Sequence, residues 1–323
     1  MQLFPRLRLV PDGTQIQFMK GRYAGLILSA VLSLLSVVLY FAPGLNYGID
    51  FKGGIVIEAR APGPVEFSTL RPALSALNLG QVGLQQFGSP QDVLIRLERQ
   101  RAVTEEEAQQ CAVEEVRASL EAYRSGTQVR RVEAVGGSVS RELFVNGMMA
   151  LGFSLLAMLA YIWFRFEWQF GVGAVITLLL DVTKVVGFYV LTGFQFNLTA
   201  IAAILTIMGY SINDKVVVYD RMRENLRKYK TMSLRELIDL SINETLSRTI
   251  GTSMATFLAT IPLALFGGEA LEEFAITMLF GIVLATSSSI FIAAPILLFL
   301  GEDKLRRGPP AEDAQAADAA PIP

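Results

Sequence analysis

The chain of 323 residues is 52% hydrophobic and only 18% charged, with a mean hydropathy of +0.44 and a formal net charge of −2. This composition is too apolar for an ordinary soluble domain. We therefore predict an integral membrane protein.

Six apolar runs approach the roughly 20 residues that a helix needs to cross a bilayer. They cover 23–41, 143–164, 170–191, 198–218, 250–266 and 274–300. After an N-terminal segment, 1–22, we place the first transmembrane helix at 23–42 and the other five within 141–300. The first run is long and has no small-residue cleavage site, so it is predicted to stay in the protein rather than be removed as a signal peptide.

The polar segment 43–140, between the first two spans, is long enough for a small domain. Strand patterns occupy 55–60, 81–87, 92–98 and 129–135, and helix patterns occupy 65–77 and 104–123. The resulting order, βαββαβ, predicts a ferredoxin-like fold. Such a fold by itself identifies no function.

Lys and Arg residues gather before the first span, in the connection 219–247 between the fourth and fifth spans, and after the last span. The connections 192–197 and 267–273 contain none. Since positive residues mark cytoplasmic loops, both termini are predicted to be cytoplasmic and the βαββαβ domain extracytoplasmic. The Ala- and Pro-rich tail, 301–323, is expected to be disordered.

The fourth span ends in the charged stretch GYSINDKVVVYDR, which places Asn213, Asp214 and Lys215 side by side. Asp214 precedes Arg221 by seven residues, which puts it roughly 10 Å beneath the predicted cytoplasmic surface. Arg248 lies in the first turns of the fifth span, at a comparable depth. The pattern therefore allows Asp214 and Arg248 to meet across two helices.

The third span contributes two further charges, Asp181 and Lys184, three residues apart on one helical face. A charged side chain in the middle of a span costs about 2.5–3.5 kcal/mol on insertion scales. These groups are therefore expected to face the bundle interior, to pair with each other, or to line water.

Each of these features also has a structural interpretation. Asp214 would lie at a frayed helix end with Lys215 reaching to the headgroups, and Arg248 would be an ordinary positive-inside anchor. Asp181 and Lys184 would form a self-neutralising pair that only holds helices in register. The small-residue stretch ATSSS at 285–289 is more typical of helix packing than of a channel lining.

The chain has no G-x-x-x-x-G-K-[ST] nucleotide loop and no histidine, and its lone Cys111 leaves no zinc site. We therefore expect no enzyme activity, no cofactor and no bound metal, and an ion gradient is the remaining energy source. A buried Asp that alternates between its protonated and ionised forms moves a proton. Arg keeps its proton and acts as a fixed counter-charge.

Three motifs now carry a family resemblance: LNYGIDFKGGIVIEAR (45–60), GYSINDKVVVYDRMREN (209–225) and SINETLSRTI (241–250). In this order, on six spans with one outer domain after the first, they resemble the SecF family. This family belongs to the SecD/SecF group of the RND superfamily and supplies an accessory membrane subunit of the bacterial Sec protein translocase. The resemblance covers nearly the whole chain apart from the terminal tails.

The resemblance implies an RND-like half of six helices in the bacterial cytoplasmic (inner) membrane, with SecD as partner and the SecYEG channel as neighbour. YajC is a further candidate partner. The implied activity uses the proton-motive force to help draw unfolded protein chains outward; membrane lipid is an expected contact and nucleic acid is not.

The family's intramembrane Asp and Arg map to Asp214 and Arg248, and we add Asn213, Asp181 and Lys184 to the candidate proton pathway. The family motif at the head of the outer domain comprises Gly48, Asp50, Phe51, Gly53 and Gly54. Two departures stand out: Lys215 follows the Asp where a small polar residue is common, and Leu180 precedes Asp181 where His is common.

Two other functions remain open, a half of an RND-like exporter of small solutes and an assembly factor without ion coupling. One chain of six spans is only half of the usual two-half transporter, and its outer domain is small, which weighs against the exporter. Both H⁺ and Na⁺ remain candidate coupling ions.

Overall fold

A computed structural model describes residues 11, 14–80, 82–87, 89–98 and 105–300, and the tail predicted to be disordered, 301–323, lies outside them. The chain divides into two compact units. The sheet unit comprises Leu45–Gly152 and Phe194–Ile201, and the membrane unit comprises Met1–Gly44, Phe153–Gly193 and Ala202–Pro323. Each unit is described by itself.

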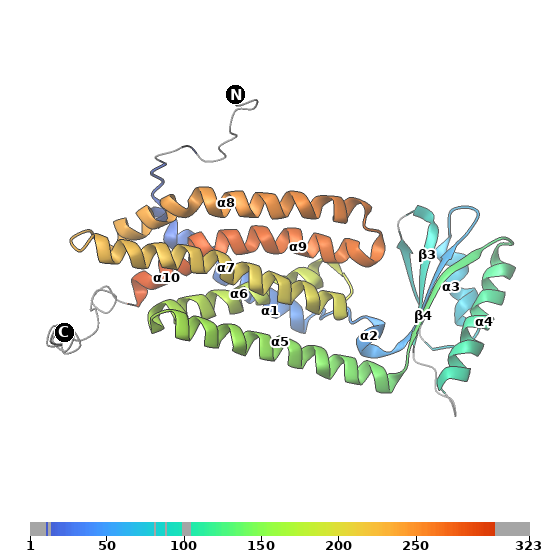
Figure 1. Ribbon diagram of the computed structural model, residues 1–323. Helices are drawn as coiled ribbons and strands as arrows, with labels where there is room; N and C mark the ends of the chain where they lie inside the picture. Colours follow the sequence, from blue (N-terminus) through green and yellow to red (C-terminus); the bar gives the residue numbers. More distant parts are fainter. Residues whose placement is uncertain (1–10, 12–13, 81, 88, 99–104, 301–323) are drawn as a thin grey trace, which may run out of the picture. The chain divides into compact units, whose positions relative to one another are not determined.

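The sheet unit contains an antiparallel sheet of four strands in the order β2-β3-β1-β4 (Figure 1). Along the chain the elements are β1 (Gly54–Arg60), α3 (Phe67–Ser75), β2 (Val82–Phe87), β3 (Ser89–Leu97), α4 (Glu105–Tyr123) and β4 (Gln128–Val135). The predicted βαββαβ order is confirmed, and the strand order is that of a split βαβ fold.

One face of this sheet forms a hydrophobic core. Ile55, Ile57 and Ala59 pair in register with Leu97, Ile95 and Val93, so these alternate residues of β1 and β3 share a face. The two helices α3 and α4 cover that face, as Figure 1 shows, with five further core residues: Leu70, Leu74, Ala112, Val116 and Leu120. The single cysteine, Cys111, is on the exposed side of α4.

Within the described residues, six helical segments are long and apolar enough to span a membrane, as predicted. The first five contain α1 (Arg22–Phe41), α5 (Gly137–Arg165), α6 (Trp168–Thr192), α7 (Leu198–Lys228) and α8 (Leu234–Phe266). The sixth consists of α9 (Glu269–Ser288), a π-helical turn (Ser289–Ala293) and α10 (Ala294–Phe299). A short 3₁₀ turn, Phe18–Gly21, precedes α1.

The connection expected over 219–247 is mostly helical. Helix α7 continues to Lys228 and α8 starts at Leu234, so only 229–233 lies between them. Ser233 caps α8, and its side chain accepts a hydrogen bond from the backbone N–H of Glu236. Hydropathy detects the apolar part of a helix, whereas the charged turns that extend beyond it remain helical.

Helices α6, α7 and α9 form the interior of the membrane unit, with 50–56% of their apolar windows buried, against 6–17% for α1, α5 and α8. Small residues bring helices close together here. A side chain at Gly187 of α6 would overlap Ser36 of α1, and one at Gly281 of α9 would overlap Ile207 of α7. Such contacts between small residues are typical of membrane helix packing.

The π-helical turn in the last span has a local cause. Pro295 has no backbone N–H and so cannot donate to the carbonyl of Phe291, four residues earlier. The helix widens over Ser289–Ala293, immediately before this proline. Turns of this type are frequent at functional sites.

Candidate functional site

Asp181 of α6 lies at the centre of a polar network inside the membrane unit and is 1% exposed. Its Oδ2 accepts hydrogen bonds from the hydroxyls of Ser211 on α7 (2.8 Å) and Ser288 on α9 (2.7 Å). Lys215 of α7 donates to the same oxygen at 3.0 Å. The three interior helices therefore converge on one carboxylate.

Two lysines accompany this carboxylate. Lys215 is 1% exposed and also contacts the Ser211 hydroxyl. Lys184, three residues after Asp181, places its Nζ 3.7 Å from Asp181 Oδ1. At that distance it is an ion pair without a hydrogen bond, and among the described residues Lys184 Nζ has no hydrogen-bond partner.

Asp214 lies next to this network, on α7, and is 5% exposed. It is within the electrostatic reach of Lys215 and Arg248, and Ser289 of the π-helical turn lies against it. Its Oδ2 is buried and accepts no hydrogen bond from any residue that the structure describes. Since α7 continues to Lys228, the interpretation of Asp214 as part of a frayed helix end is wrong.

We call Asp181, Lys184, Asp214 and Lys215 the buried charge cluster. Fully ionised, it holds two negative and two positive charges, which makes it neutral as a whole. Isolated ions in such surroundings would cost several kcal/mol each, so this balance is what allows four ionisable groups to lie inside the bundle. A change in the protonation of any one member upsets the balance.

Two of the predicted site residues do not join the cluster. Asn213 and Arg248 are exposed on the surfaces of α7 and α8. The structure forms no ion pair within 4.0 Å between Arg248 and Asp214 in its described part. Arg248 instead lines a separate cavity of about 430 Å³ with the α7 and α8 residues Val217, Asp220, Arg221, Glu224, Glu244 and Thr245.

Sequence reasoning missed Lys215 as the partner of Asp181, and with it the serines that complete the network. The sequence indicated Lys215 as a headgroup anchor and as a departure from the family pattern, and 285–289 as a packing stretch. The spacing of Ser211 and Lys215, four residues apart on one helical face, was the available signal. Among the described residues, no group of three or more His, Cys, Asp or Glu side chains could hold a metal ion.

The family motif at the head of the outer domain occupies a second polar site, within the sheet unit. A short helix, α2 (Ile49–Lys52), carries Asp50, whose Oδ2 accepts the backbone N–H of Leu198 at 3.1 Å. Leu198 is the first residue of α7, so Asp50 caps that helix together with Asn197, which accepts from Ala200 N–H at 2.9 Å. Asp50 therefore acts as a helix cap.

The remaining motif residues hold this segment in place. Gly48 donates its N–H to the Phe196 carbonyl at 2.9 Å. The Phe51 ring packs against those of Phe144 and Phe196, with centroids 5.4 and 5.9 Å away. Gly53 and Gly54 have φ values of +72° and +125°, which side chains other than hydrogen rarely allow.

Two family models match the chain. The model of the C-terminal part of the protein export membrane protein SecD/SecF matches residues 115–303, which include the buried charge cluster. The model of the SecD/SecF GG motif matches residues 41–61, which include α2 and Gly53. The two models thus cover the two sites described above.

Curated relatives and solved structures agree with these matches. The chain is 46% identical over 308 residues to protein translocase subunit SecF of Rickettsia felis, covering 95% of this chain and 98% of the relative. It is also 46% identical over 305 residues to SecF of Rickettsia akari. The crystal structure of SecDF from Thermus thermophilus, a translocon-associated membrane protein, is 35% identical with a TM-score of 0.79 over 89% of this chain. This chain spans only 39% of that SecDF chain.

Proposed function

This chain belongs to the SecF family of protein translocase subunits, and we propose that it uses the proton-motive force, together with a SecD partner, to promote protein export. In this proposal it acts in the bacterial cytoplasmic membrane, next to the SecYEG channel, on unfolded chains that leave the cell interior. Both termini are cytoplasmic, and the sheet unit works on the far side. The chain is a coupling subunit and not an enzyme.

The buried charge cluster is the observation that carries this proposal. Asp214 is buried beside Asp181, and its Oδ2 has no hydrogen-bond donor among the described residues. Asp181 Oδ1 likewise has none, whereas Asp181 Oδ2 accepts from Ser211 and Ser288. Intramembrane ionisable residues of this kind usually belong to ion pathways. We assign the exchangeable proton to Asp214 and the role of fixed counter-charges to Lys215, Lys184 and Arg248.

Protonation of Asp214 changes the charge of the cluster. With Asp214 ionised, the two carboxylates balance the two ammonium groups. With Asp214 protonated, Lys184 and Lys215 face a single carboxylate, and an uncompensated positive charge in a low-dielectric interior is costly. The helices that bear the cluster and its serine donors, α6, α7 and α9, then favour a different arrangement, which is how a proton flux would drive movement.

A SecD partner is supported by the polar groups that the chain leaves on its membrane-spanning helices. Arg248 and Asn213 are exposed on α8 and α7, where hydrocarbon would not solvate them. Helices α5 and α8 bury only 6% and 11% of their apolar windows within this chain. A SecD half that covers these surfaces would bring a partner to Arg248. The SecDF chain has room for such a half, since this chain spans only 39% of it.

Asp214→Asn tests the proposal directly. The variant keeps the size and polarity of the side chain and fixes it in a neutral form. We expect normal insertion and normal SecD co-purification, and loss of the gradient-stimulated part of precursor translocation into membrane vesicles. Separate arms impose a proton or a sodium gradient and so identify the coupling ion. Asp220→Asn, on the same helix but outside the cluster, is the matched control and should keep the stimulation.

The other functions predict different results. An assembly factor without ion coupling predicts that Asp214→Asn reduces the amount of assembled complex or changes nothing. A solute exporter predicts solute flux from the isolated chain without SecD or SecYEG. Full gradient stimulation in Asp214→Asn would refute the proton role of this carboxylate.

A further inference from the structure

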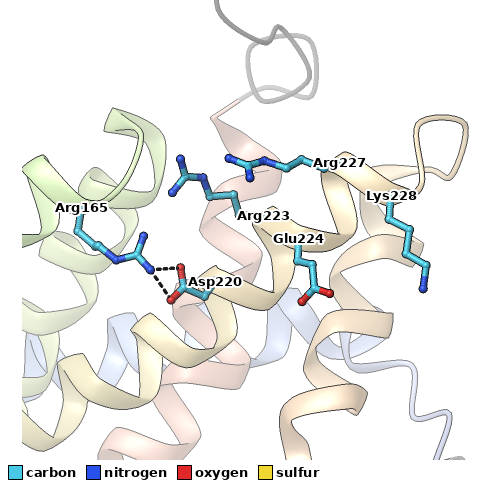
Figure 2. Close-up of a pocket in the computed structure, with 6 residues that line it drawn as sticks. All are labelled: Arg165, Asp220, Arg223, Glu224, Arg227 and Lys228. Carbon is cyan, nitrogen blue, oxygen red and sulfur yellow. Dashed lines mark hydrogen bonds and ion pairs between the residues drawn. The ribbon is translucent and has the colours of Figure 1, made fainter.

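The membrane unit has a second charged site, which the buried cluster does not use. It is a cavity of about 500 Å³ at the end of α5 and along the last turns of α7. All six residues that line it are charged: Arg165, Asp220, Arg223, Glu224, Arg227 and Lys228. Figure 2 shows the guanidinium groups of Arg223 and Arg227 directed to the side on which Arg165 lies.

The acidic residues of this basic pocket are already engaged. Arg165 donates to both oxygens of Asp220, at 2.8 and 2.7 Å (Figure 2). Glu224 accepts from Arg221 at 2.6 Å, and Arg221 lies outside the pocket lining. Neither carboxylate is therefore available to neutralise the remaining cations.

Two of the cations in the pocket, in contrast to its carboxylates, lack close hydrogen-bond or ion-pair partners. Arg227 forms no ion pair or hydrogen bond with any residue in the described part of the chain. Arg223 has its nearest carboxylate, Glu167, at 4.0 Å, and its buried Nε has no hydrogen-bond partner among the described residues. An arginine whose Nε is buried and unpaired needs an acceptor. The pocket thus has two guanidinium groups ready for an anion.

The position of the basic pocket relative to the apolar spans indicates which anion it binds. The apolar run of α5 ends at Phe164, directly before Arg165, and that of α7 ends just before Asp220. Arg223 and Arg227 lie about 5 and 10 Å farther along α7 than Asp220. The headgroup region of each leaflet is roughly 5–7 Å thick. The two guanidinium groups therefore lie at the level of lipid phosphates or just beyond it.

Aromatic side chains beside the pocket mark the same level. Trp163, Phe164 and Trp168, at the end of α5 and the start of α6, are 64%, 89% and 44% exposed. Exposed aromatic residues at span ends are typical of the membrane interface. A soluble anion would not contact these aromatic side chains, whereas the glycerol and upper acyl region of a lipid would.

The geometry points to a binding site for the headgroup of an anionic phospholipid in this basic pocket. Arg223 and Arg227 hold the phosphate by charge-assisted hydrogen bonds, the pair of Arg165 with Asp220 forms a neutral wall of the pocket, and the aromatic rim contacts the lipid body. The site selects lipids that carry net negative charge, because a zwitterionic headgroup offers the same phosphate with a compensating cation.

Native mass spectrometry of the full chain in neutral detergent tests this site, with phosphatidylglycerol and phosphatidylcholine as probes. We expect phosphatidylglycerol to bind about 25-fold more tightly, since each of the two guanidinium groups near the anionic headgroup contributes about five-fold. Arg227→Gln, which removes no ion pair or hydrogen bond with a described residue, should lower the affinity for phosphatidylglycerol about five-fold. Arg223→Gln/Arg227→Gln should bring it near that of phosphatidylcholine.

The control variant Lys20→Gln/Arg235→Gln removes two exposed cations of the membrane unit outside the pocket. It should keep the preference for phosphatidylglycerol. Three results would overturn the site: equal binding of the two lipids, an unchanged preference in both pocket variants, or displacement of phosphatidylglycerol by millimolar inorganic phosphate or by an acidic peptide. The last result would assign the pocket to a soluble anion or a protein partner.

Discussion

The two buried carboxylates of the membrane unit differ in how they are held. Asp181 accepts from Ser211, Ser288 and Lys215 through one oxygen, with Lys184 near the other. Asp181 Oδ1 and Asp214 Oδ2 are both buried and accept no hydrogen bond from a described residue. The two carboxylates differ at Asp181 Oδ2, whose three donors join α6, α7 and α9, so that a change at Asp181 disturbs three existing contacts. This difference favours Asp214 over Asp181 as the proton-exchanging residue of the proposal.

Breaking the pair of Lys215 and Asp181 should therefore affect folding more than switching. In Lys215→Met, Asp181 keeps its charge and loses its closest cation, which for buried pairs costs about 3–5 kcal/mol. We expect a marked loss of folded protein and a lower temperature of aggregation in detergent. Asp181→Asn/Lys215→Met, which removes both charges, should recover most of that stability.

The double variant is the decisive comparison. A coupling between the two substitutions of about 2 kcal/mol or more would establish that the ion pair stabilises the bundle. Additive effects would contradict the network described here, because they would mean that Asp181 does not depend on Lys215.

In the sheet unit, Asp92 provides a pH-dependent contribution to stability. Its pKa is lowered from 3.8 to about 2, chiefly by hydrogen bonds from Arg60 and further by the Ser89 hydroxyl. Because the folded-state pKa is below the unfolded value, the stabilisation is complete above about pH 4 and is lost as the pH falls from about 4 to about 2.

Asp92→Asn should remove this contribution. We expect a loss of about 1 kcal/mol at neutral pH, since Arg60 is partly exposed and solvent screens the pair. The protection of β1 and β3 amides against hydrogen exchange should fall at pH 6. At pH 2 the wild-type protein and the variant should converge. An equal difference at both pH values would show that the carboxylate charge is not involved.

At the scale of elements, the join between α2 and β1 contains two glycines with positive φ, Gly53 and Gly54. Gly53 has φ +72° and ψ 170°, a combination that is essentially restricted to glycine. A Cβ there would also lie 3.2 Å from the Val135 carbonyl oxygen and 3.3 Å from Ser140 Oγ. The position is therefore constrained by its backbone conformation and by its neighbours.

Gly53→Ala should destabilise the sheet unit by about 1–3 kcal/mol. Limited proteolysis of the full chain should detect this as faster cleavage within 54–135. Gly83→Ala on β2, where the nearest atom to a new Cβ is 3.5 Å away and φ is ordinary, is the control and should cleave no faster than wild type. Equal rates for Gly53→Ala and wild type would show that the motif tolerates a side chain.

Most elements of this fold could be predicted from the sequence. The strands at 55–60 and 129–135 differ from β1 and β4 by one residue, because alternation with one buried face is a strong signal. The spans were found by hydropathy, but the polar ends of α7 and α8 were not, since charged turns carry no such signal. The capping of α7 by Asp50 was not predicted, because it is a contact between segments that are distant in sequence. The π-helical turn was not predicted either, because it is a local distortion of the helix before Pro295.

The sequence predicted how deep the charged residues lie in the membrane, but not which way their side chains face. Hydropathy placed Asp181 and Asp214 within apolar runs and Arg248 two residues before the run 250–266. Successive residues of a helix differ by 100° in direction, so only the packed bundle decides which of Asn213, Asp214 and Lys215 face inward. The structure buries Asp214 and Lys215 and exposes Asn213. The sequence pattern allowed Asp214 and Arg248 to meet, whereas the structure pairs Lys215 with Asp181.

At the scale of the whole molecule, the proposed function requires a particular orientation in the membrane. The protonatable Asp214 must communicate with the cytoplasmic side, and the sheet unit must lie on the side where exported chains emerge. The distribution of Lys and Arg predicts this orientation, with the short connection 229–233 inside. Thiol labelling can probe both sides of the membrane, with Cys111 in the sheet unit and a cysteine introduced at the end of α7.

Cys111 is a natural probe of the outer side, since it is exposed on α4 and is the only cysteine of the chain. A membrane-impermeant maleimide added to intact cells, with the outer membrane permeabilised where one is present, should label Cys111 in the wild-type protein. In a Cys111→Ser background, Lys228→Cys at the end of α7 should stay unlabelled until the cells are lysed. The reverse pattern would place the basic pocket outside and the sheet unit inside the cell. Export from the sheet-unit side would then be impossible, whatever the result for Asp214.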